Sequence, residues 1–184
     1  FEGAQYGQSF VLAHVHIKCH IARDEVSLFF SPAGLVVVAL LPHGRFRIVA
    51  TVDEAPAAPD REFVQALLDD RGPRDAPVAI EDVAWSSRFR VHHRVAESLK
   101  QGRVLLVGDA AHVHSPAGGQ AMNTGIQDPV SLGTALADRL AGADESLLAS
   151  WARRRRTVAR DVVRATHRMT RIATLQGRAV MLLR

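Results

Sequence analysis

The stretch from Gly102 to Asp128 gathers residue types that suit a polar ligand. A short apolar run, Val104 to Val107, leads directly into Gly108 and Asp109. Such a run predicts a strand buried on both faces in a parallel sheet, and open α/β sheets bind ligands beyond the carboxyl ends of their strands. A carboxylate there, beside small residues, can accept hydrogen bonds from sugar or ribityl hydroxyls.

The glycine pair Gly118–Gly119 extends this candidate site, together with a helix that we expect to start near Gly119. Glycine has no Cβ, so the backbone can approach a flat ligand closely. The first N–H groups of a helix are unpaired and carry a partial positive charge, which favours an anionic ring system. Pro129 lies inside the same predicted helix, where it removes a backbone hydrogen bond and should kink the helix.

Three pairs of histidines could each form part of a metal site: His14-x-His16, His92–His93 and His112-x-His114. None of these clusters has a third and fourth ligand at a recognised spacing, and the single cysteine, Cys19, does not complete one. We therefore expect no metal site. The simpler interpretation of His112 is a histidine hydrogen-bonded beneath the loop, and that of Asp109 is a helix cap or turn residue.

Composition limits the class of protein. The chain has 184 residues, of which 47% are apolar and 23% charged, so it can bury a core and is not globally disordered. Its longest apolar run, Leu35 to Leu41, is far shorter than the roughly 20 residues that span a bilayer. With one cysteine and no signal segment, we expect a cytoplasmic protein that does not enter a membrane. The net charge is +4, but aromatic residues are only 5%, which argues against nucleic-acid binding.

The elements that must position the candidate site fall into two parts. Residues 1–95 predict a domain with an antiparallel sheet, and residues 96–184 predict an α/β part with long helices. Within the first part, a helix capped by Asp60 ends at Arg71–Gly72. The predicted strands are 9–17, 25–30, 35–41, 45–52 and an extended stretch 78–91. The last helix shows one apolar stripe, made of Leu147, Trp151, Val158, Val162, Ala165, Met169 and Ile172.

The order Gly108–Asp109–Ala–Ala–His112, then Pro116, Gly118–Gly119 and Asn123, resembles the second flavin motif of single-component FAD-dependent aromatic hydroxylases. That family includes p-hydroxybenzoate hydroxylase, phenol hydroxylase and polyketide hydroxylases. The match is dense over residues 102–136, extends into the helix around Trp151, and is looser over residues 8–52. The resemblance implies an α/β (α+β) fold, with an antiparallel substrate-side sheet followed by the C-terminal part of an FAD-binding Rossmann-like domain and long helices.

The resemblance also implies the activity. In that family NAD(P)H reduces FAD, O₂ adds at flavin C4a, and the resulting hydroperoxide hydroxylates an aromatic substrate, so no side-chain nucleophile is needed. The matching aspartate binds the ribityl part of FAD, and the loop and helix start line the isoalloxazine edge. The implied FAD-binding residues are Gly108, Asp109, Pro116, Gly118, Gly119, Gln120, Ala121, Met122 and Asn123.

Some family features are missing from the sequence. It contains neither the Gly-x-Gly-x-x-Gly fingerprint for the ADP half of FAD nor the middle Asp–Gly motif, and His14 stands where the family often has an acidic residue. We therefore expect a fragment of a longer enzyme that is inactive alone, and that self-associates or pairs with a missing N-terminal segment. The alternative is a non-catalytic fragment that binds an aromatic ligand or another chain. The residues do not name the aromatic substrate.

Overall fold

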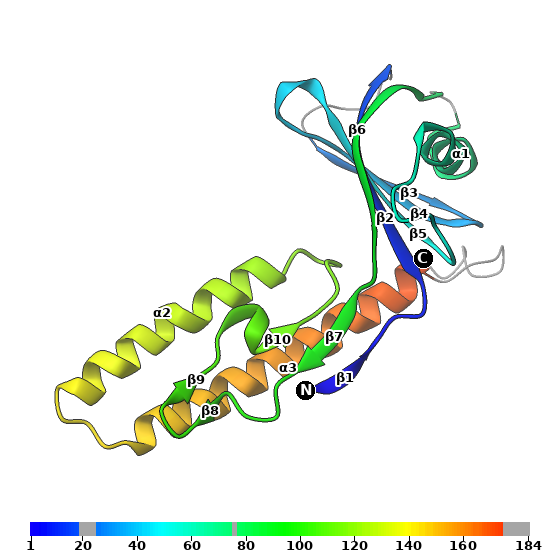
Figure 1. Ribbon diagram of the computed structural model, residues 1–184. Coiled ribbons are helices and arrows are strands. Elements are labelled where there is room, and N and C mark those ends of the chain that lie inside the picture. The colour runs from blue at the N-terminus through cyan, green and yellow to red at the C-terminus, as the bar shows by residue number, and fades with distance from the viewer. Residues whose placement is uncertain (19–24, 75–76, 175–184) are drawn as a thin grey trace. The chain divides into compact units, whose positions relative to one another are not determined.

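The chain folds into two compact units. The computed structural model describes residues 1–18, 25–74 and 77–174 (Figure 1). Phe1–Tyr6 and Val91–Arg171 form one unit, here called the helical unit. The described residues of Gly7–Arg90 form the body of the other, the sheet unit, and residues 172–174 are grouped with it. The predicted boundary at residue 95, between a substrate-side sheet domain and a flavin-side part, stays a prediction. Cys19 lies outside the described residues.

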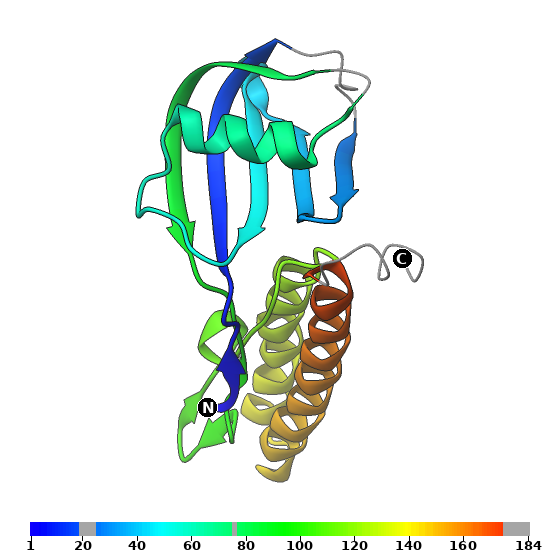
Figure 2. The same ribbon diagram turned by 90° about the vertical axis from the view of Figure 1, so that its right-hand side faces the viewer.

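Two long helices dominate the helical unit. They lie side by side (Figure 2), and the indole Nε1–H of Trp151 on the second donates to Ser131 Oγ on the first at 3.0 Å. Trp151 is 2% exposed, which confirms its predicted place in the core. The helices are α2 (Ala121–Leu140) and α3 (Ser146–Thr174). The short elements are β1 (Glu2–Gln5), β7 (His92–Val95), β8 (Lys100–Gln101), β9 (Val104–Leu105), the 3₁₀ turn η2 (Gly108–Ala110) and β10 (His112–Val113). Strand β7 pairs antiparallel with both β1 and β10.

The prediction of a buried parallel strand over Val104–Val107 is wrong for the described residues. Only Val104–Leu105 form a strand, β9, and it pairs antiparallel with β8. Gly102, with a φ of 56°, makes the tight turn between the two strands. Val104 is 63% exposed. A parallel strand is buried only between neighbours, and no described strand lies parallel to this run.

The buried face of α3 lies one residue further along than predicted. Val158, Met169 and Ile172 of the predicted stripe are exposed. Trp151 of that stripe is buried, and the other buried positions of α3 are Leu148, Ala152, Ala159, Val163, Thr166 and Thr170. The two threonines look polar in the sequence, but Thr166 Oγ1 donates to the Val162 carbonyl at 2.9 Å and Thr170 Oγ1 to the Thr166 carbonyl at 2.8 Å. Because the helix itself satisfies these hydroxyls, their methyl groups can face the core.

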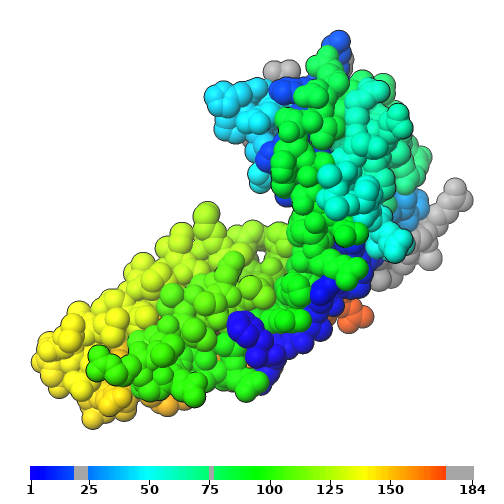
Figure 3. Space-filling view, viewed as in Figure 1, coloured from blue at the N-terminus to red at the C-terminus, as the bar shows by residue number. Residues whose placement is uncertain are grey.

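Helix α2 starts at Ala121, slightly after the expected position near Gly119, and remains helical through Pro129. The proline therefore does not interrupt the helix. In the space-filling view the yellow-green residues of α2 form an outer surface of the helical unit (Figure 3). Large apolar side chains are exposed along it, among them Met122, Ile126 and Val130.

In its described residues, the sheet unit forms a five-stranded antiparallel sheet with the order β3-β4-β5-β2-β6. Helix α1 (Arg61–Arg71) lies across one face of this sheet (Figure 2). The predicted antiparallel strands are confirmed, because consecutive strands β3, β4 and β5 pair antiparallel with each other and β5 pairs antiparallel with β2. The strands are β2 (Ser9–Lys18), β3 (Val26–Ser31), β4 (Gly34–Leu40), β5 (Phe46–Val52) and β6 (Ala79–Phe89), with a 3₁₀ turn η1 (Pro42–Gly44) before β5.

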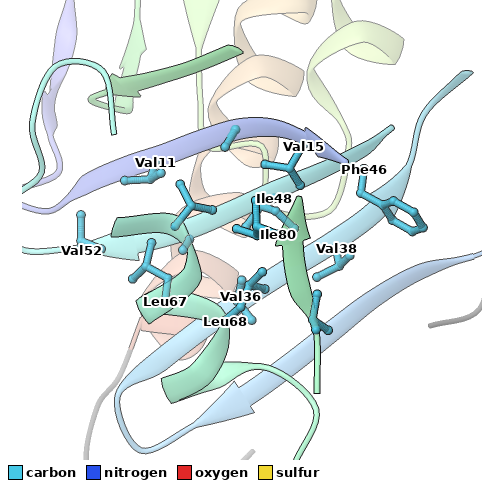
Figure 4. Close-up of a cluster of buried hydrophobic side chains, with 14 of the residues drawn as sticks. Val11, Val15, Val36, Val38, Phe46, Ile48, Val52, Leu67, Leu68 and Ile80 are labelled. Carbon is cyan, nitrogen blue, oxygen red and sulfur yellow. The ribbon is translucent and has the colours of Figure 1, made fainter. Parts of the chain in front are cut away.

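The core of the sheet unit lies between the sheet and α1 (Figure 4). Alternate residues along each strand point to it, as the period of two requires, and Val11, Val36 and Ile48 are fully buried. The predicted cap of α1 is confirmed: Asp60 Oδ1 accepts a hydrogen bond from the Phe63 N–H at 2.8 Å. These contacts leave the opposite face of the sheet uncovered by α1.

Candidate functional site

The turn η2 presents Asp109 to solvent. Gly108 adopts a φ of 59°, a left-handed conformation that suits glycine, and the Ala111 N–H closes the turn on the Gly108 carbonyl at 2.8 Å. The Asp109 side chain is exposed and forms no hydrogen bond or ion pair with the other described residues. Asp109 lies in the turn, as the simpler interpretation expected, but its side chain caps no helix, so its carboxylate is available to a ligand.

A buried aspartate holds this turn in place. Asp128, on α2, is 1% exposed, and its Oδ2 accepts hydrogen bonds from the Gly108 N–H at 3.0 Å and from His112 Nε2 at 2.7 Å. Its Oδ1 accepts from Arg155 Nε on α3 at 2.7 Å. One carboxylate thus ties together η2, β10, α2 and α3. The expectation that His112 is hydrogen-bonded beneath the loop is confirmed.

The environment keeps Asp128 ionised. Burial alone would raise the pKa of its carboxyl group, but the hydrogen bonds from Gly108, His112 and Arg155 outweigh burial and hold the pKa below its ordinary value. Arg155 is itself oriented, because its Nη2 donates to the Thr124 carbonyl at 3.3 Å. An ionised acceptor strengthens each of these hydrogen bonds.

The two glycines of the following loop have different tasks. Both have left-handed φ values, 82° at Gly118 and 64° at Gly119, and the Gly119 N–H closes a turn on the Pro116 carbonyl at 3.0 Å. A Cβ at Gly118 would lie 2.9 Å from Met169 Cε, so that side is already occupied by α3. A Cβ at Gly119 would meet no described atom within 4 Å. Gly119 is therefore the one of the two glycines with open space beside it.

The start of α2 leaves its first donors free. Gln120 is the N-cap but provides no side-chain hydrogen bond, and the first helical bond is from the Thr124 N–H to the Gln120 carbonyl at 3.0 Å. Ala121, Met122 and Asn123 are exposed, and their N–H groups have no acceptor among the described residues. Such a helix end attracts electron-rich or anionic groups.

Beside this loop, His114 Nε2 is buried and has no hydrogen-bond partner among the described residues, whereas its Nδ1 lies 3.1 Å from the Ser115 carbonyl. An unpaired buried polar atom needs a partner, such as a bound group. The start of α2 also contacts η2, since a Cβ at Gly125 would lie 3.6 Å from Gly108 Cα. The free carboxylate, the open glycine turn and the unpaired N–H groups fit a ligand that combines hydroxyl groups with an electron-rich ring.

Sequence reasoning missed the residues that hold the site. Asp128 ends the stretch Gly102–Asp128 but had no predicted role, and Arg155 lies in the run of four arginines at 153–156, to which no role was assigned. The available signal was weak: an acidic residue in the same helix as the glycine loop, and an arginine on the neighbouring helix. Only packing reveals that Arg155 is 12% exposed and points inward.

Other kinds of site find little support in the described part of the chain. No group of three or more histidine, cysteine, aspartate or glutamate side chains is placed to hold a metal there. None of the described helices is both long and apolar enough to cross a membrane. A hollow of about 560 Å³ lies in the sheet unit between Leu28–Pro32 and Asp70–Arg74, and none of the predicted flavin residues lines it.

Comparison with known proteins identifies the family. Residues 13–166 match the family model described as FAD binding domain. The chain belongs to the FAD binding domain family. This match confirms the expected flavoprotein family, and FAD is the cofactor that its name specifies.

Relatives of this FAD-binding chain include aromatic monooxygenases. It is 36% identical to 6-methylpretetramide 4-monooxygenase of Streptomyces rimosus over 92% of the chain and 31% of the relative. It is 31% identical to pentachlorophenol 4-monooxygenase of Sphingobium chlorophenolicum over 98% of the chain and 34% of the relative. The chain therefore spans about a third of the length of these relatives.

The fold has a counterpart in a solved structure. The crystal structure of CabE, an aromatic hydroxylase from angucycline biosynthesis, superposes with a TM-score of 0.73 at 30% identity. The match covers 99% of this chain and 37% of CabE. It confirms the predicted mixture of antiparallel sheet and long helices.

Proposed function

We propose that this chain is part of an FAD-dependent monooxygenase that hydroxylates an aromatic substrate with NAD(P)H and O₂. The single observation that carries the proposal is the Asp128 network, which holds the exposed Asp109 turn against the start of α2. The similarity to two aromatic monooxygenases over nearly the whole chain supports it.

In this proposal the helical unit holds the flavin. Asp109 accepts hydrogen bonds from ribityl hydroxyls, and Gly119 admits the ring edge to the backbone because no side chain occupies the adjacent space. The N–H groups at the start of α2 stabilise negative charge on the electron-rich ring. The binding residues are Gly108, Asp109, Pro116, Gly118, Gly119, Gln120, Ala121, Met122 and Asn123.

The bound FAD would supply the redox chemistry, in which NAD(P)H donates electrons and O₂ is activated at ring position C4a for oxygen transfer. The chain's own residues bind and orient. We propose that residues 1–95 provide the substrate side and residues 96–184 the flavin side. We also propose that the chain self-associates or pairs with a further segment of a longer protein.

Purification of the full protein tests this function directly. We expect a yellow protein with a flavin spectrum that consumes NAD(P)H when suitable aromatic compounds are added. A panel of phenols and polycyclic aromatics, with hydroxylated product measured against NAD(P)H consumed, defines the substrate. A colourless protein that does not bind added FAD would contradict the proposal and favour a non-catalytic binding role.

A further inference from the structure

The hollow of about 560 Å³ in the sheet unit lies where α1 ends beside β3, the outermost strand of the described sheet. Helix α1 starts near β6, since Arg61 Nη1 donates to the Ile80 carbonyl at 3.3 Å, and crosses the sheet towards β3 (Figure 2). Residues 28–32 line the hollow on one side and residues 70–74 on the other. Its volume is in the range of sites for small organic ligands.

The guanidinium of Arg71 borders this hollow and is only partly satisfied by the protein. The side chain is 10% exposed, and its Nη1 donates to the Thr51 carbonyl on β5. Its Nε is buried and has no hydrogen-bond partner among the described residues. Asp70 Oδ2 lies 3.7 Å from this Nε, which is beyond hydrogen-bond distance, and the Asp70 side chain is 60% exposed. The edge of the guanidinium formed by Nε and Nη2 therefore remains available to a further acceptor.

The surrounding residues favour an anion beside Arg71. Gly34, at the start of β4, has a φ of 127°, and a Cβ there would lie 3.1 Å from Arg71 Nη1, so a side chain at this position would crowd the guanidinium. The neighbouring Thr51 hydroxyl is also buried without a hydrogen-bond partner in the described chain. Burial lowers the pKa of Arg71, and the charges of Asp70 and Asp53 act in the opposite direction. An anion would satisfy the Nε–H and stabilise the charged guanidinium.

The lining of the hollow indicates which kind of anion fits. Leu28, Phe29 and Phe30 provide an apolar wall, and the charged lining residues are Asp70 and two arginines, Arg71 and Arg74. The C-terminal end of α1 adds a partial negative charge, so the hollow is only weakly positive and suits a single negative charge. A planar carboxylate can accept two parallel hydrogen bonds from a guanidinium. The volume and the apolar wall leave room for a hydrocarbon group attached to that carboxylate.

We propose that this hollow binds an organic monocarboxylate. Its carboxylate accepts hydrogen bonds from Nε and Nη2 of Arg71, and its apolar body contacts Leu28, Phe29 and Phe30. This inference goes beyond the proposed function, which assigns no role to the end of α1. The site is built entirely from the sheet unit, and none of the residues proposed to bind FAD lines it.

Three probes test the class of ligand: octanoate, its neutral analogue octanamide, and acetate, which lacks the apolar body. Equilibrium dialysis of the chain measures each affinity, and we expect octanoate to bind most tightly. Nuclear magnetic resonance follows the Arg71 Nε–H, which should shift downfield when octanoate accepts its hydrogen bond. Arg71→Lys assigns this resonance by its loss. Because lysine keeps the charge but has no two-donor edge, this variant should bind octanoate about tenfold more weakly.

A second variant leaves Arg71 and its hydrogen bond to the Thr51 carbonyl in place. Asp70→Asn removes the negative charge beside the guanidinium and should tighten octanoate binding about threefold, as expected for a partly exposed charge pair. Glu62→Gln, an exposed residue in the first turn of α1, makes the same change in net charge at the other end of the helix and should leave the affinity unchanged. Circular dichroism confirms that each variant is folded.

An affinity for octanamide equal to that for octanoate would overturn the inference, as would an Arg71 Nε–H resonance that does not move at saturating octanoate. Equal effects of Asp70→Asn and Glu62→Gln would show that net charge, rather than this hollow, controls binding, and would also overturn it. Acetate that binds as tightly as octanoate would overturn the assignment of an apolar body to the ligand.

Discussion

Asp109 and Asp128 carry the same side chain in opposite environments, and this difference sets their roles. Asp109 is exposed with no protein partner among the described residues, whereas Asp128 is 1% exposed with three donors around it. The sequence motif predicted Asp109, because a carboxylate beside glycine and alanine is typical of a ligand contact. It did not predict Asp128, since a buried acid becomes recognisable only when His112 and Arg155 are brought to it.

Replacing Asp109 tests the ligand contact at this position. Asp109→Ala should weaken FAD binding by about 1.5–3 kcal/mol, the value of a hydrogen bond to a charged group. Because Asp109 supports no other described residue, the thermal melting temperature should stay unchanged. Isothermal titration or quenching of flavin fluorescence measures the affinity. Asp138→Ala, an exposed aspartate further along α2, is the matched control. Unchanged FAD affinity in Asp109→Ala would remove Asp109 from the site.

Replacing Gly119 tests whether the open space beside the loop is where the flavin ring lies. Gly119→Val places a branched Cβ in the free space and forces a φ of 64° on a residue that disfavours it, at a cost of about 1–2 kcal/mol in stability. We expect flavin content and coupled hydroxylation to fall much further than stability does, with residual NAD(P)H oxidation releasing peroxide. Gly133→Val adds the same side chain at an exposed helical position with no close neighbour. If Gly119→Val retained flavin and coupled product formation, the loop would not be the flavin wall.

Among the elements, α2 organises the helical unit, because its N-terminal half contacts η2, β10 and α3 through Asp128. The sequence predicted those elements that depend on residues close together in the chain, such as the Asp60 cap and the alternating strands of the sheet. The predictions failed for Val104–Val107 and for the buried face of α3. In the first case burial depends on neighbouring strands, and in the second Thr166 and Thr170 are satisfied by their own helix.

Asp128→Asn should lower the free energy of unfolding, because the Asp128 carboxylate links α2 to η2, β10 and α3. An asparagine keeps the shape but leaves Arg155 partly buried without a charge partner, and such losses cost about 3–5 kcal/mol. Chemical denaturation of the variant measures the loss. Asp161→Asn is the control, because its i,i+3 pair with Arg164 is largely exposed and should contribute less than about 1 kcal/mol. A loss in Asp128→Asn no larger than that of the control would contradict the role of the network.

The lowered pKa of Asp128 predicts that the free energy of unfolding depends on pH. The pKa of Asp128 is lowered in the folded chain, so the unfolded chain takes up a proton first as pH falls. The stability contribution is complete above the ordinary carboxyl pKa and disappears as pH falls through the lowered folded value. Denaturation midpoints measured at a series of acidic pH values should therefore converge for wild type and Asp128→Asn. A difference between the two that stays constant down to the lowest pH would contradict this titration.

At the scale of the whole molecule, we expect the exposed side of α2 to control whether chains associate. Met122, Ile126 and Val130 are spaced by four residues and are 72%, 55% and 67% exposed, so they form one apolar stripe on the helix. Leu140, at the end of the helix, is 89% exposed. Exposed apolar side chains that share one helix face promote association in water. The sequence predicted self-association only from the missing family motifs, and the packing shows that α2 carries exposed apolar side chains.

The 184-residue chain should therefore self-associate in a concentration-dependent manner, and light scattering across a dilution series measures the mass. Val130→Lys places a charge in the centre of the stripe and should shift the chain towards the monomer, because burying an unpaired ammonium in an apolar contact is unfavourable. Gln127→Lys adds the same charge beside the stripe while leaving its apolar residues in place, and should retain most of the association. A wild-type chain that stays monomeric at every concentration would contradict the prediction, and equal effects of the two lysines would show that net charge, rather than the stripe, controls association.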